Sequence, residues 1–156
     1  MNCTKRQVNN NKMERWMIMV NTSYDEIYIC FRRNCGVDSS TLPKTDEGKY
    51  ELIHNAVMHY NTKVDSSETQ LICNDELEEI NVKLDTNRLL LLAYCLKYSV
   101  LENELEAFEQ VWQPFTKEMG QKFYKDQIKG RENSLDRVNF KILELLTRLD
   151  SGSIMD

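Results

Sequence analysis

The stretch from Asp85 to Trp112 constrains the fold more than any other part of the chain, because it is long and contains neither glycine nor proline. Its first half is apolar on nearly every side, from Leu89 to Leu96. A helix of that kind is normally buried on several sides at the centre of a bundle. We therefore predict a central apolar helix near 86–112 in an all-α fold, a compact bundle of about five to seven helices.

Two seams lie in the C-terminal half, where apolar residues alternate at spacings of four and three, as in a heptad repeat. The first seam consists of Leu101, Leu105, Phe108, Trp112 and Phe115. The second seam consists of Leu135, Val138, Ile142, Leu145 and Leu149. Such seams form either the interior of a closed bundle or an interface with another chain.

The ends of the C-terminal helices are predicted from proline, glycine and capping residues. Pro114 removes a backbone donor and is expected to kink or stop the helix that carries the first seam. A weaker helix that includes Gly120 then ends by Gly130, and Asn133 or Ser134 caps the last helix.

Residues 15–32 fit two patterns. Apolar runs on both sides of the polar segment 21–25 suit a β-hairpin, which would make the fold α+β with an N-terminal hairpin at 15–32. Against this, Ser23 and Glu26 have the spacing of a capping box, and Gly36 stands where a helix takes its left-handed terminal residue. We favour the helix and keep the hairpin as the alternative.

Two further helices are expected between these regions. Thr45 or Asp46 can cap a helix that runs to about Tyr60, whose apolar residues recur at helical spacing. Asn74 or Asp75 then opens a short helix, with one apolar face made of Leu77, Ile80 and Leu84.

The chain of 156 residues fits one domain. We predict a mobile arm at 1–12, a single helical domain at 13–150 and a disordered tail at 151–156. No run of about 18 apolar residues is present, and the N-terminus is polar, so we expect neither a transmembrane helix nor a secretion signal. An intracellular location, cytoplasmic or nuclear, follows from this expectation.

The charges are unevenly distributed along the chain. Residues 65–109 hold eleven acids and three bases, whereas residues 117–141 hold four acids and seven bases. Two such arms can pack against each other across Pro114 or against a second copy of the chain. The net charge of −5 argues against a protein whose whole surface follows a polyanion.

A basic aromatic stretch, Lys122–Lys125 followed by Lys129 and Arg131, raises nucleic-acid binding as a hypothesis. We favour a different interpretation, in which the lysine stems lie around a core Phe123 and their charged ends reach the solvent. We therefore expect no nucleic-acid partner.

One spacing resembles a metal site, namely that of Cys30, Cys35, His54 and His59. Both pairs fit a Cys2His2 zinc site, but 18 residues separate them where about 12 are usual. The same residues suggest a thiol enzyme, because Arg32 and Arg33 would lower the pKa of Cys35. No orienting third group accompanies them, so the zinc- or thiol-dependent enzyme stays an alternative, and we predict no catalytic residue, metal or cofactor.

In size, acidity and the possession of an almost wholly apolar internal helix, the chain resembles the compact viral Bcl-2-like proteins. The Asn-Trp-Gly-Arg type motif of the cellular family and a C-terminal membrane anchor are absent. The resemblance implies a host-modulating adaptor, which is a second functional alternative.

The sequence favours a non-enzymatic protein–protein interaction module or a small helical subunit of a larger assembly. Its partner would be another protein or a second copy of the chain. The predicted partner-binding residues are those of the first seam, Leu101, Leu105, Phe108, Trp112 and Phe115.

Overall fold

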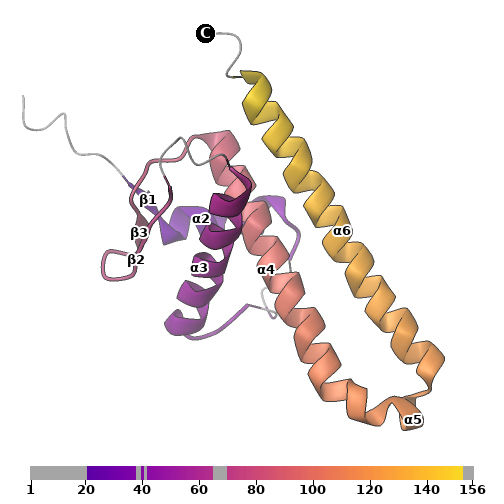
Figure 1. Cartoon of the computed structure of the whole chain (residues 1–156). Helices are drawn as coiled ribbons and strands as arrows, with labels where there is room; N and C mark the ends of the chain where they lie inside the picture. Colours follow the sequence, from indigo (N-terminus) through magenta and orange to yellow (C-terminus); the bar gives the residue numbers. More distant parts are fainter. Residues whose placement is uncertain (1–20, 38–39, 41, 65–69, 153–156) are drawn as a thin grey trace, which may run out of the picture.

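The computed structural model describes residues 21–37, 40, 42–64 and 70–152 (Figure 1). Its elements are, in chain order, β1 (Thr22–Ser23), α2 (Tyr24–Asn34), α3 (Asp46–Lys63), β2 (Cys73–Asn74), β3 (Glu79–Ile80), α4 (Thr86–Trp112), the 3-10 helix η3 (Gln113–Phe115), α5 (Thr116–Met119) and α6 (Gln121–Gly152). The described part is mostly helical, but it contains four long helices rather than five to seven. The predicted number was too high for two reasons: α6 takes the place of the two helices expected after Pro114, and the short helix expected from Asn74 or Asp75 is a pair of strands.

The capping box settles the structure of the first described segment. The Ser23 hydroxyl accepts a hydrogen bond from the backbone N–H of Glu26, and the Glu26 carboxylate accepts one from the N–H of Ser23. Both bonds satisfy donors that the start of a helix leaves free. A hairpin at 15–32 is therefore wrong for residues 24–32, while residues 15–20 lie outside the described part.

A small antiparallel sheet gives the fold its limited β character. Its strand order is β1-β3-β2, with Thr22 paired to Ile80 and Cys73 paired to the same residue from the other side. The short helix expected from Asn74 or Asp75 is absent, and a hairpin between β2 and β3 takes its place. The side-chain oxygen of Asn74 accepts hydrogen bonds from the backbone N–H groups of Glu76 and Leu77. These bonds close a turn instead of capping a helix.

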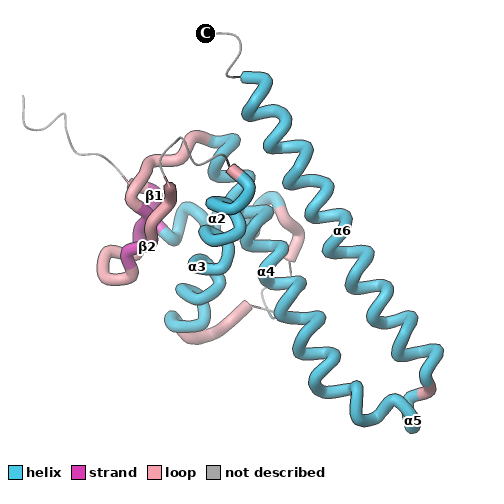
Figure 2. Tube along the Cα trace, viewed as in Figure 1, coloured by secondary structure: helices cyan, strands magenta, loops and turns pink. Residues whose placement is uncertain are grey.

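The first half of α4 is central, as its apolar sequence predicts. Together with α2, α3 and the small sheet it forms a compact part of the molecule that we call the head. Helices α2 and α3 pack on the first half of α4, and the side chains of Leu91, Leu92 and Leu96 are completely buried there. Ile27 and Phe31 of α2 meet the same core. Figure 2 shows the three helices together on one side of the molecule, beside the small sheet.

The second half of α4 and the first half of α6 form an antiparallel helical hairpin that extends away from the head (Figure 1). Pro114 lies in the 3-10 turn that ends α4, as the sequence predicts. The chain reverses at Gly120, whose φ of 88° favours glycine. We call residues 108–124 the hairpin tip.

Helix α6 continues without interruption through Gly130 and ends at Gly152. The predicted break at Gly130 is wrong, and Ser134 does not cap a new helix, because its hydroxyl donates to the carbonyl of Gly130. A glycine inside a helix costs about 1 kcal/mol relative to alanine. Packing of α6 against α4, which buries Val138, Ile142 and Leu145, offsets that cost. In the described part of the chain, no helix is both long and apolar enough to cross a membrane.

Candidate protein-binding surface

The first seam begins in the head and runs down α4 toward the tip. Leu101 packs against the buried core and borders the same cleft as Val138 of α6. Leu105 is half-buried, at the next position of the seam. Leu101 and Leu105, the first two residues of the predicted partner-binding seam, therefore lie where α4 meets α6.

Phe108 makes the principal aromatic contact between the two arms of the hairpin. Its ring stacks on the ring of Tyr124, with 5.8 Å between the centroids and an interplanar angle of 19°. The guanidinium carbon of Arg131 lies 4.0 Å from the centre of the same ring. Arg131 also donates to the carbonyl and the side-chain oxygen of Gln127, which fixes its orientation. Phe108 thus joins the arms and is only partly accessible.

The lower end of the seam is open to solvent. The side chains of Trp112 and Phe115 are 41% and 51% exposed, although both are large and apolar. The rings of Trp112 and Phe115 meet edge to face, with 6.4 Å between their centroids. The centroid of the Trp112 ring is 6.3 Å from that of Phe108, so the three rings form a continuous series. Exposed aromatic side chains that hold each other in place are suited to anchor a protein interface.

Two more apolar residues of the tip are exposed, and the sequence analysis did not assign them to the surface. Val111 is 56% exposed and Phe123 is 53% exposed. The expectation that lysine stems surround a core Phe123 is therefore wrong. Val111 precedes Trp112 of the first seam, and Phe123 precedes Tyr124, which stacks on Phe108. Adjacent helical residues point about 100° apart, and for Val111 this offset from the seam was a sequence signal that it would not face the other arm.

The same geometry bears on the basic aromatic stretch. Tyr124 is stacked on Phe108 and Arg131 covers that ring, so neither is free to stack on a base. Lys122, Lys125 and Lys129 are exposed.

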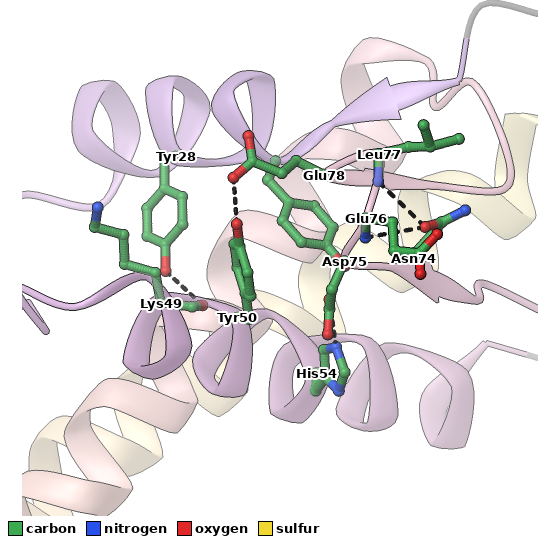
Figure 3. Close-up of polar contacts among 10 residues, drawn as sticks. Tyr28, Lys49, Tyr50, His54, Asn74, Asp75, Glu76, Leu77 and Glu78 are labelled. Carbon is green, nitrogen blue, oxygen red and sulfur yellow. Dashed lines mark hydrogen bonds and ion pairs between the residues drawn. The ribbon is translucent and has the colours of Figure 1, made fainter.

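A polar cluster fastens the β2–β3 turn to the helices of the head (Figure 3). Asp75 accepts a hydrogen bond of 2.7 Å from the Tyr24 hydroxyl, and its same oxygen lies 2.8 Å from Nε2 of His54. On the neighbouring part of the turn, the Tyr50 hydroxyl donates to the carboxylate of Glu78, the one described non-glycine residue with positive φ.

These contacts shift the pKa values of the cluster in consistent directions. The Tyr24 hydrogen bond, followed by the His54 contact, lowers the pKa of Asp75. Burial, followed by the hydrogen bond to Asp75, raises the pKa of Tyr24 above its usual range. The hydrogen bond to Glu78 is the main reason that the pKa of Tyr50 rises to about 12. A charged carboxylate held by neutral phenols is a structural clamp, and no nucleophile is activated in it.

The four residues of the zinc or thiol hypothesis are not gathered in one place. His54 pairs with Asp75, whereas His59 lies 3.4 Å from Glu102 of α4. The thiol of Cys35 is buried and contacts the carbonyl of Ala93. Among the residues that the structure describes, no group of three His, Cys, Asp or Glu side chains could hold a metal ion.

The expected activation of Cys35 by Arg32 and Arg33 is wrong. Burial raises the pKa of the Cys35 thiol to about 12, and the nearby Lys97 only partly opposes this. Both arginines point into solvent from the last turn of α2, where they suit the helix dipole instead. The thiol therefore packs as a small apolar group.

Comparison with known proteins gives the chain its relatives. The family model of the YomZ prophage protein matches residues 18–150, which include the head, both seams and the tip. A protein of Bacillus subtilis (strain 168), described as the SPbeta prophage-derived uncharacterized protein YomZ, is 34% identical over 114 residues. The aligned part is 73% of this chain and 85% of that relative. No solved structure matches. The chain belongs to the YomZ prophage protein family.

Proposed function

We propose that this protein is a non-enzymatic protein–protein interaction module, and that it binds its partner through the hairpin tip. The observation that carries the proposal is the group of exposed apolar side chains at the end of a projecting hairpin. Soluble proteins normally leave such residues exposed singly, and a contiguous group of them indicates a contact surface. The same proposal includes an intracellular location and use as a subunit of a larger assembly.

The residues of the first seam divide into two roles in this proposal. Trp112 and Phe115 contact the partner directly, because they combine large rings with high exposure. Leu101, Leu105 and Phe108 hold α4 against α6, and so position the tip. Rigid aromatic anchors lose little conformational entropy on binding, which favours them as sites where binding energy concentrates.

Two observations favour an interaction role over an enzymatic one. The Tyr24, Asp75 and His54 cluster contains no activated nucleophile, and the described cysteines have raised pKa values. In the cleft that Lys97, Glu104, Ser134 and Arg137 border, the Lys97 amine donates to the carbonyl of Cys35 and the Ser134 hydroxyl donates to the carbonyl of Gly130. These features support the absence of a reaction centre in the described part of the chain.

The test is an affinity capture from cells of the native host with tagged full-length protein. The variant Phe115→Glu places a charge in the tip without filling or emptying a core site. The matched control is Phe140→Glu, because Phe140 is even more exposed, at 72%, but lies on the outer side of α6 away from the tip. We expect wild type and the control to recover the same proteins and the tip variant to lose them. Equal recovery by all three would contradict the proposal.

A further inference from the structure

The distal hairpin has charges on its two arms that are opposite in sign. The described acids of distal α4 are Glu102, Glu104, Glu106 and Glu109, and no basic residue lies among them. Residues 117–131 contain five bases and two acids, the bases being Lys117, Lys122, Lys125, Lys129 and Arg131. One arm is thus acidic and the other is basic.

These opposite charges do not form ion pairs with each other within the hairpin. In the described ranges, no Lys, Arg or His nitrogen of α6 lies within 4.0 Å of a carboxylate of α4. Glu102 is directed toward His59 of the head. The stacked rings of Phe108 and Tyr124 lie between the arms, and Glu106, Glu109, Lys122 and Lys129 are all exposed. The arms therefore offer complementary charges outward.

From this pattern we infer that the occupant of the hairpin tip is a second copy of the same chain, an inference that rests on the proposed function of the tip. Two hairpins pack with their tips together and their heads at the same end. They form a short antiparallel four-helix bundle, in which each acidic α4 lies beside the basic α6 of the partner copy. The exposed apolar residues of both tips, Val111, Trp112, Phe115 and Phe123, make its interior.

Two-fold symmetry allows two arrangements of stacked hairpins, one with both heads at the same end and one with the heads at opposite ends. The charges favour the first. If the heads lay at opposite ends, α4 would stack on the α4 of the partner copy, and Glu106 and Glu109 would face like charges. Like charges across an interface cost free energy, whereas alternating acidic and basic helices attract each other. The arrangement with both heads at one end also brings the apolar groups of the two tips onto each other.

The experiment is sedimentation equilibrium of the full chain over a range of concentrations, at low and high salt. We expect a concentration-dependent mass of two chains that weakens at high salt, because surface charges are screened. Phe123→Glu should abolish the dimer, and Phe140→Glu should retain it. Thermal melts of both variants at a concentration where wild type is monomeric establish that each still folds.

A mixing experiment tests the pairing of arms. The variant Glu106→Lys with Glu109→Lys places lysine at positions 106, 109, 122 and 129 of the two arms, and Lys122→Glu with Lys129→Glu places glutamate at the same four positions. Each variant alone should be monomeric, whereas an equimolar mixture should form a heterodimer. If the charges acted only within one chain, mixing would restore nothing, and that result would overturn the inference.

Two other outcomes would also overturn the inference: a wild-type chain that stays monomeric at every concentration, or a dimer that Phe123→Glu leaves intact. A monomer whose tip still captures a host protein, with loss in Phe115→Glu, would remove the second copy as occupant and leave the interaction proposal standing. Loss of both the dimer and tip-dependent capture would remove both proposals.

Discussion

The ring of Phe108 stacks on the ring of Tyr124, and this contact joins α4 to α6 near the free end of the hairpin. Arg131 adds a cation to the same ring. Beyond this contact lie the turn and the exposed side chains of Trp112 and Phe115. The contact therefore separates the part of the seam that holds the hairpin together from the part that we propose to bind a partner.

Phe108→Ala should lower the free energy of unfolding by about 1 to 3 kcal/mol, because it removes a stacked pair, a cation–π contact and half-buried apolar area. Urea unfolding of the monomer measures this change. Phe140→Ala is the control, since its ring is exposed, and it should change the stability by less than about 0.5 kcal/mol. Equal effects would mean that the Phe108 contact does not stabilise the hairpin.

Leu145→Ala should cost about 2 to 5 kcal/mol, because Leu145 is only 4% exposed in the second seam. Leu105→Ala should cost less, since that side chain is half-buried. Leu143 lies two residues before Leu145 but is 51% exposed, so Leu143→Ala should be nearly neutral and serves as the control. Melting curves of the three variants rank them. A Leu145 variant as stable as the control would show that the second seam is not core.

Two glycines should respond to alanine in opposite directions. Gly120 has a φ of 88°, which strains any residue with a Cβ, so Gly120→Ala should destabilise the chain by about 1 to 2 kcal/mol. Gly130 lies inside α6 with open space around its Cα, so Gly130→Ala should stabilise by about 1 kcal/mol. Chemical denaturation of both variants checks the signs. A destabilising Gly130→Ala would contradict an uninterrupted α6.

The Asp75 clamp should make part of the stability depend on pH. Its pKa is lower in the folded chain than in the unfolded chain, so the unfolded chain binds more protons between the two values. The stabilisation is complete above the unfolded-state pKa of about 3.9 and is lost as the pH falls through the folded-state value. The stability difference between wild type and Asp75→Asn should therefore shrink on acidification. Denaturant titrations from neutral pH downward measure it.

Glu76 is exposed on the same turn, and Glu76→Gln is the matched control for this titration. Its stability difference from wild type should stay small at every pH. If Asp75→Asn and Glu76→Gln followed the same course, the dependence would come from net charge rather than from the clamp.

Cys35 and Cys95 should resist alkylation in the native state. Both are almost fully buried, and burial raises the pKa of each thiol to about 12. The reactive thiolate is therefore scarce at neutral pH. Iodoacetamide labelling followed by peptide mass spectrometry should show slow modification at both residues and rapid modification in denaturant. Fast native labelling of Cys35 would revive the thiol-enzyme alternative.

The sequence by itself determined the elements that rest on local interactions. The apolar run after Asp85 specified the central place of α4, because a helix segment that is apolar on nearly every side must be buried. The Asp85 cap and Pro114 specified its two ends. Ser23 and Glu26 specified the start of α2, and Thr45 specified the start of α3, since each cap satisfies nearby backbone donors. The first seam likewise located most of the candidate surface.

Only the tertiary structure decided the features in which distant residues compete. Asn74 either caps a helix or closes a turn, and pairing of β3 with both β1 and β2 selected the turn. Gly130 favours a helix end, but packing of α6 along α4 carried the helix through it. The spacing of apolar residues along a helix also does not tell which of these residues another helix covers. Contact with α6 partly covers Phe108, whereas Trp112 and Phe115 lie where the hairpin ends, so only the fold left them exposed.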